Sequence, residues 1–247
     1  MLMNDASAVI FDDHQPRSQQ EIWRLLDGMA FLHAGLWESP ELLDPTLSLC
    51  NCANLIRYGS PETVRRFPVP ESFIPVFVGE GWPLLLEMVD PDVAGILHTL
   101  ISDPQPLHDA LARYPFTLIH GDYRSMNLGL GTEPWPVTVF DWGWSGYGAP
   151  TIDLAWFVYW HDVAWSPVSV EAAVDHYRVR LADYLGASLD DATWQPMWEL
   201  GVLVNILRIG CLRAWFIAND QNEAFREVYR GLMKPVNGQV RAAVRWL

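Results

Sequence analysis

Apolar residues recur at helical spacing along most of the chain. The first clear helix begins after Ser18, where Glu21 completes a capping box that satisfies free backbone N–H groups of the first turn. Its apolar face consists of Ile22, Leu25, Leu26, Met29 and Leu32 or His33, and it stops near Gly35. Further helices are predicted over residues 82–102 (broken or kinked around Pro91), 106–114, 152–161, 168–185, 191–218 and 221–245. Proline and glycine punctuate residues 36–82, where we expect one or two short helices.

Two short runs in the middle of the chain have a strand-like composition. They are FTLIH (116–120) and VTVFDW (137–142), and turn residues separate them. No internal repeat, linker or low-complexity segment interrupts the pattern. The sequence therefore predicts an α+β fold that is mostly α-helical, with a short β-loop-β insertion near its centre.

The amino-acid composition predicts a well-packed hydrophobic core. Half of the 247 residues are apolar, and thirteen tryptophans indicate deep packing between helices. The apolar stretch 200–218 is interrupted by Asn205, Arg208 and Arg213, which favours a buried core helix over a membrane span. Three cysteines without regular spacing predict free thiols rather than disulfides or a zinc site.

The net charge limits the classes of binding partner, and the N-terminal residues indicate the cellular compartment. A formal net charge of −14 argues against nucleic acid and against an anionic membrane surface, and it is compatible with a cationic substrate. The first residues, MLMNDASAVIFDD, lack the basic start of a signal peptide. We therefore expect a cytoplasmic protein.

Polar residues cluster around the two strand-like runs and suggest phosphoryl transfer. Asp122 follows the first run, where a carboxylate can be held as a base. Asn127 and Asp141 offer the oxygen ligands that Mg²⁺ prefers, and Arg124 adds a positive charge for a phosphate. A base, two metal ligands and a cation are the groups that phosphoryl transfer needs.

The same residues resemble a known family. HGDYRSMN (120–127) followed by VFDW (139–142) is similar to the H-x-D-x-x-x-x-N and Asp motifs of the aminoglycoside phosphotransferase and choline kinase family, relatives of the protein kinases. GAPTIDLAWF (148–157) and MAFLHAGLW (29–37) extend the resemblance. It implies a small-molecule kinase that uses Mg²⁺ and ATP, or another nucleoside triphosphate, to phosphorylate a hydroxyl group.

The resemblance also implies roles for single residues. Asp122 would be the catalytic aspartate, and Asn127 and Asp141 would hold the metal. Arg124 stands where protein kinases present a lysine to the γ-phosphate. His120 and Asp153 would shape the loop by hydrogen bonds.

The resemblance covers the large C-terminal lobe of the kinase fold, and the small lobe is essentially absent. No G-x-G-x-x-G precedes His120, and the single lysine is Lys234. Residues 1–15 are assigned to the last small-lobe strand and hinge, with Met3 and Asn4 at the adenine, and residues 16–247 to the large lobe. A truncated gene, a natural single-lobe protein and a second chain that supplies the other half all remain open. The face left by the missing lobe is a candidate for self-association.

Three other interpretations stay open at this point. The chain could be an inactive kinase-like lobe that acts as a binding or interaction module. The polar cluster could be a turn in which Asp and Asn cap backbone groups, or a metal-hydrolase site of His120, Asp122, His161 and Asp162. Asp162 is also a candidate contact for a cationic acceptor, as are Asp190 and Asp191, although a helix N-cap explains Asp190 better.

Overall fold

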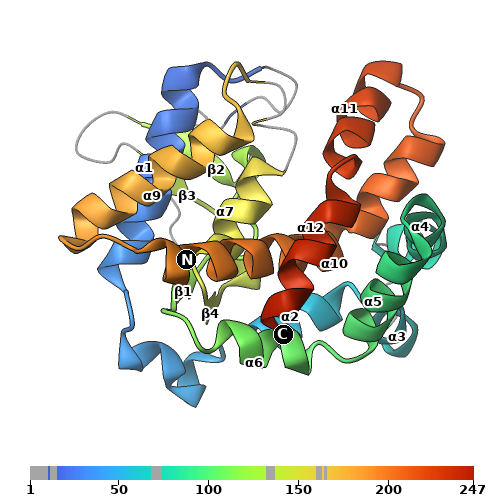
Figure 1. Cartoon of the computed structure of the whole chain (residues 1–247). Coiled ribbons are helices and arrows are strands. Elements are labelled where there is room, and N and C mark those ends of the chain that lie inside the picture. Colours follow the sequence, from blue (N-terminus) through green and yellow to red (C-terminus); the bar gives the residue numbers. More distant parts are fainter. Residues whose placement is uncertain (1–10, 12–15, 68–73, 132–136, 160–162, 164–165) are drawn as a thin grey trace, which may run out of the picture.

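Helices make up most of the computed structural model, which describes residues 11, 16–67, 74–131, 137–159, 163 and 166–247 (Figure 1). The helices are α1 (Gln19–Gly35), α2 (Cys52–Tyr58), α3 (Pro61–Arg66), α4 (Ile74–Met88), α5 (Pro91–Ser102), α6 (Gln105–Leu111), α7 (Thr151–Val158), α9 (Val170–Leu185), α10 (Asp191–Asn219), α11 (Glu223–Met233) and α12 (Val236–Ala243). The strands are β1 (Thr117–Ile119), β2 (Leu128–Leu130), β3 (Val137–Val139) and β4 (Gly146–Gly148). The prediction of a mostly helical α+β fold is confirmed.

Helix α1 begins as the sequence predicted. The Ser18 hydroxyl accepts a hydrogen bond from the Glu21 N–H, and the Glu21 carboxylate accepts one from the Ser18 N–H at 2.7 Å. The predicted apolar face is buried, and it packs against α9. Because α9 runs across α1 (Figure 1), these two helices form one side of the core.

Helix α10 is the central helix of the other side. It packs against α4, α7, α11 and α12, and both termini of α10 carry polar caps (Asp190 and Asp220). Its length and apolarity would suffice to cross a membrane, but 78% of the most apolar stretch is buried inside the protein. The expectation of a core helix over 200–218 is met, and Asn205, Arg208 and Arg213 are buried within it.

The central β structure differs from the predicted β-loop-β insertion. The two predicted strands, β1 and β3, do not pair with each other: β1 pairs antiparallel with β4, and β2 pairs antiparallel with β3. The strands β2 and β4 were not predicted, because Leu-Gly-Leu and Gly-Tyr-Gly have the composition of turns. A glycine is required at Gly146 of β4, since a Cβ there would lie 2.3 Å from the carbonyl oxygen of Cys50.

The predicted break near Pro91 is confirmed, because α4 ends at Met88 and α5 begins at Pro91. Helix α4 begins earlier than predicted, at Ile74. The predicted helix 221–245 is divided into α11 and α12, because Pro235 cannot continue the hydrogen-bond ladder of α11. Cys50, Cys52 and Cys211 are free thiols, as expected.

Candidate active site

One buried carboxylate holds the loop that follows β1. Asp153, in the first turn of α7, accepts hydrogen bonds from the backbone N–H groups of His120 (2.6 Å) and Gly121 (2.8 Å). Gly121 has a φ of +79°, and a Cβ there would lie 2.2 Å from the carbonyl oxygen of Trp144. The loop therefore depends on a glycine at this position and on an acceptor that satisfies its buried N–H groups.

Asp153 is positioned in turn by α1 and α9. His33 Nε2 lies 3.3 Å from Asp153 Oδ2, and His33 Nδ1 lies 2.5 Å from the hydroxyl of Tyr177, with all three side chains fully buried. Burial acts to raise the pKa of the Asp153 carboxyl, but hydrogen bonds from His33 and from the His120 N–H outweigh it and leave that pKa below its ordinary value. Asp153 is therefore an ionised anchor at neutral pH.

Both ring nitrogens of His120 serve backbone groups. Nε2 lies 2.6 Å from the carbonyl oxygen of Phe140, and Nδ1 accepts from the Asp122 N–H at 3.2 Å. These partners select the tautomer that carries its proton on Nε2. The arrangement ties the loop to the chain after β3 and leaves neither nitrogen for a substrate.

The carboxylate of Asp122 receives a donor on each oxygen. Arg124 Nε donates to Oδ1 at 3.0 Å, and Asn127 Nδ2 donates to Oδ2 at 2.7 Å and to the Asp122 backbone oxygen at 2.9 Å. Only 14% of the Asp122 side chain is exposed. A carboxylate has about four lone-pair sites, so Asp122 can still accept a proton from a further hydroxyl.

Asn127 and Asp141 lie at the same end of the β2–β3 ribbon. Leu128 pairs with Val139, and the Phe140 N–H donates to the backbone carbonyl oxygen of Asn127 at 2.8 Å, which brings Asp141 next to Asn127. Asp141 is exposed, has a φ of +52° and accepts a 3.4 Å hydrogen bond from the Gly143 N–H. An exposed loop carboxylate beside a carboxamide is an arrangement that can accept a hydrated cation.

This pair fits Mg²⁺. Asn127 turns its amide nitrogen toward Asp122, so its oxygen is the atom left for a cation, and Asp141 supplies a carboxylate. Among the described residues no group of three or more His, Cys, Asp or Glu could hold a metal ion. A Mg²⁺ ion at this place would therefore share its coordination with phosphate oxygens of a ligand.

Some predicted site residues lie outside the described residues. These are Met3, Asn4, His161 and Asp162. Asp190 is the N-cap of α10, accepting from the Thr193 N–H at 2.8 Å, and Asp191 pairs with Arg178 at 2.8 Å. The helix-cap interpretation thus accounts for Asp190.

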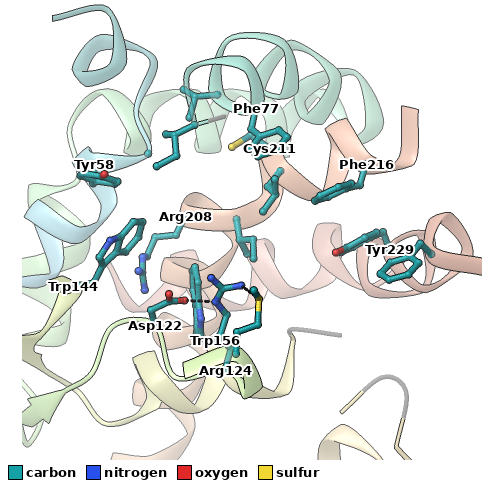
Figure 2. A pocket seen from close by; sticks show the side chains of 17 residues that line it. Tyr58, Phe77, Asp122, Arg124, Trp144, Trp156, Arg208, Cys211, Phe216 and Tyr229 are labelled. Atoms are coloured by element: carbon teal, nitrogen blue, oxygen red, sulfur yellow. Dashed lines mark hydrogen bonds and ion pairs between the residues drawn. The ribbon is translucent and has the colours of Figure 1, made fainter. Parts of the chain in front are cut away.

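A cavity of about 430 Å³ opens beside Asp122 (Figure 2). Its lining comes from the catalytic-loop region and from α2, α4, α7, α10 and α11. Aromatic and aliphatic side chains form most of the wall, and the charged side chains of the lining are Asp122, Arg124 and Arg208. Asp122 therefore faces a space large enough for a small molecule.

Comparison with known proteins agrees with this geometry. Residues 83–205 match the model of the phosphotransferase enzyme family, and they include Asp122, Asn127, Asp141 and Asp153. The chain is a member of this family. No curated protein matches it significantly.

A solved structure from Ralstonia eutropha JMP134, described as a "putative aminoglycoside phosphotransferase", is 16% identical to this phosphotransferase-family chain. The likeness covers 96% of this chain and 69% of that one, with a TM-score of 0.42.

Arg208 is the residue of this site that sequence reasoning missed. Its Nη2 donates to the carbonyl oxygen of Gly121 at 2.6 Å, although 87 residues separate them in the chain. Arg208 lies beyond the segment that matches the phosphotransferase family. The feature of the sequence that could have indicated it is a charged residue inside an apolar helix. By itself this feature argued only against a membrane span.

Proposed function

We propose that the chain transfers the γ-phosphate of ATP, or of another nucleoside triphosphate, to the hydroxyl group of a small molecule. The observation that supports this most is the convergence of Asp122, Asn127 and Asp141 at the start of one ribbon, inside the family-matching segment. Arg124 against Asp122 adds the cation that the reaction needs. Assignment of the residues to the large lobe of a kinase fold belongs to the same proposal.

The chemistry assigns tasks to Asp122, Asn127 and Asp141. Asp122 takes the proton of the acceptor hydroxyl while the acceptor oxygen bonds to phosphorus and the bond from phosphorus to the leaving diphosphate oxygen breaks. Asn127 keeps the carboxylate of Asp122 oriented, because its amide holds both Oδ2 and the backbone oxygen. Asn127 and Asp141 would hold Mg²⁺, which when bound neutralises the charge on the nucleotide phosphates.

The metal assignment is tested by nucleotide binding. Wild-type protein titrated with ATP by calorimetry should bind it more tightly with Mg²⁺ than without, and Asp141→Ala should remove that difference because a carboxylate ligand is lost. Asp190→Ala is the matched control: it also removes one aspartate, but from a helix cap, so the effect of Mg²⁺ should persist. An unchanged Mg²⁺ dependence in Asp141→Ala would contradict the assignment.

The base assignment is tested by turnover. Asp122→Asn should lower phosphate transfer to an acceptor alcohol by at least about 100-fold, because an amide cannot take the hydroxyl proton. Binding of Mg²⁺ and ATP should survive, since Asp122 is not assigned to the metal. Wild-type and variant protein with equal transfer rates would refute Asp122 as the base.

The second candidate is a kinase-like binding module without catalysis. Lys234, the single lysine of the chain, lines a different groove with Tyr159 and Trp198, so it does not serve the cavity at Asp122. If wild-type protein fails to bind nucleotide at millimolar concentration with Mg²⁺, the kinase proposal falls and this candidate stands. Binding and turnover together would exclude it.

A further inference from the structure

We propose that the cavity beside Asp122 binds an acceptor alcohol with a flat, apolar body and one carboxylate, and that Arg208 holds this carboxylate. The proposal rests on the proposed function, because it takes the alcohol to be the phosphate acceptor. It names an acceptor class opposite in charge to the cationic one with which the net charge is compatible.

Aromatic rings shape the cavity. On one wall Tyr58 packs edge to face against Trp144, with the ring centroids 4.6 Å apart (Figure 2). On another wall Phe216 stacks on Tyr229, with the ring centroids 5.1 Å apart and an interplanar angle of 5°. Phe77 packs against Phe216 at 5.7 Å and connects α4 to α10. Such walls gain most from a flat, apolar ligand, which can pack against the ring faces and edges.

Arg208 supplies an anion-binding group at the base of this cavity. Its guanidinium carbon lies 4.1 Å from the ring centre of Trp156 and 5.1 Å from that of Trp144, and the residue is 7% exposed. Nη2 donates to Gly121, whereas Nε and Nη1 are buried without a hydrogen-bond partner among the described residues. Buried donors of a charged group are costly to leave unpaired, and a carboxylate oxygen that accepts from Nε or from Nη1 would form a charge-assisted hydrogen bond.

The charges around Arg208 favour an anion over a cation. Burial lowers the pKa of Arg208 to about 10, against the opposing influence of Asp122 and Asp153, and the guanidinium stays charged at neutral pH. Asp122, the acidic residue of the lining, already accepts hydrogen bonds from Arg124 and Asn127. A cationic ligand would therefore meet two arginines and a carboxylate whose oxygens are both engaged.

The spacing of the groups favours a hydroxy acid. Arg208 contacts Gly121, which directly precedes Asp122, and Figure 2 shows its side chain extending from α10 toward Asp122 beside Trp144. A ligand whose carboxylate and hydroxyl are separated by a few bonds can reach both residues.

Calorimetry without nucleotide tests the proposal on the wild-type chain. The probes are 3-hydroxy-2-phenylpropanoate, its uncharged primary amide and the ammonium alcohol 2-amino-3-phenylpropan-1-ol. We expect the carboxylate to bind at least about tenfold more tightly than the amide, because a charge-assisted hydrogen bond is replaced by a neutral one. The ammonium compound should bind most weakly.

Three variants and one control test whether Arg208 and the cavity cause the preference for the carboxylate. Arg208→Gln should remove the preference for the carboxylate, and Arg208→Lys should keep part of it, because the charge remains while the planar guanidinium donors are lost. Leu212→Trp fills the cavity from α10 and should weaken all three probes. Arg230→Gln is the control: it removes one positive charge from the exposed face of α11, where Arg230 pairs with Glu223 at 2.7 Å, and should leave the preference unchanged.

The proposal is overturned if the ammonium compound binds as tightly as the carboxylate, if Arg208→Gln keeps the preference, or if no probe binds at millimolar concentration. Its failure is separable from failure of the proposed function. These titrations contain neither nucleotide nor Mg²⁺, whereas the kinase assignment depends on nucleotide binding and turnover.

Discussion

Two residues of the candidate site adopt left-handed backbone conformations. Gly121 has a φ of +79° immediately before Asp122, and Asp141 has a φ of +52° at its own position. At Gly121 the backbone also approaches Trp144 so closely that no side chain fits. The direction of the Asp122 side chain is thus set by a conformation that only glycine adopts readily.

Replacement of Gly121 by alanine should destabilise the protein strongly. Gly121→Ala adds a Cβ that strains the backbone and meets the Trp144 carbonyl oxygen, so we expect a loss of at least about 3 kcal/mol in the free energy of unfolding. Gly186 is the matched control, because it has a φ of +66° but open space around its Cβ position. Gly186→Ala should lose about 1 kcal/mol. Urea denaturation measures both, and equal losses would contradict the close contact at Trp144.

Among the elements, α10 connects the core to the cavity. It carries Arg208, Cys211, Leu212 and Phe216 into the lining while its other sides pack against α7 and α12. Helix α4 crosses it at a glycine: a Cβ on Gly81 would lie 2.1 Å from the Cys211 carbonyl oxygen. This close approach keeps Phe77 and Val78 of α4 at the cavity wall.

Helix α4 offers a matched pair of glycines for a test. Gly81→Ala should lower the free energy of unfolding by at least about 2 kcal/mol, because the added methyl group forces α4 away from the backbone of α10. Gly79→Ala, two residues earlier on the exposed side with nothing within 4 Å, should raise it by about 0.5–1 kcal/mol through helix propensity. Thermal and urea denaturation distinguish the two signs. Stabilisation by both substitutions would show that α4 and α10 are not in close contact.

Across the whole molecule, Asp153 joins segments that are far apart in the sequence. Its carboxylate lies within hydrogen-bond distance of His33 in α1 and accepts hydrogen bonds from the backbone N–H groups of His120 and Gly121 in the loop after β1. His33 in turn contacts Tyr177 in α9. Figure 1 shows α1, α7 and α9 around this region. One buried carboxylate therefore couples the packing of three helices to the backbone of the candidate site.

The contribution of Asp153 should depend on pH in a defined direction. Because its folded-state pKa is lowered, the stabilisation is fully present above the unfolded pKa of about 3.9 and is lost as the pH falls through the folded pKa. Asp153→Asn should cost about 2–3 kcal/mol at pH 7, and the difference from wild type should shrink below about pH 4.

The control for this prediction is the exposed Asp109, whose replacement by asparagine should change stability by less than about 0.5 kcal/mol at pH 7. Urea denaturation at several pH values provides the measurement. If the gap between wild type and Asp153→Asn instead widened toward acid pH, the anchoring role of the carboxylate would be wrong.

The sequence predicted those features whose signals are local. Helix α1 could be located because its capping box and its apolar face lie within one segment, and α10 because its apolar stretch is long. The order of Asp122, Asn127 and Asp141 along a short segment was enough to indicate the family and the class of chemistry. Local spacing is informative here because these residues lie on one loop and one ribbon.

Only the tertiary structure decided which distant groups meet. The pairing of β1 with β4, the contact of His33 with Asp153 and the position of Arg208 beside Gly121 all join residues far apart in the chain. Nothing in the local pattern around Arg208 states which backbone it will contact, because that depends on how α10 crosses α4 and α7. The sequence by itself thus determined the position of the candidate loop, and the packing of the helices decided what anchors that loop and which cavity it faces.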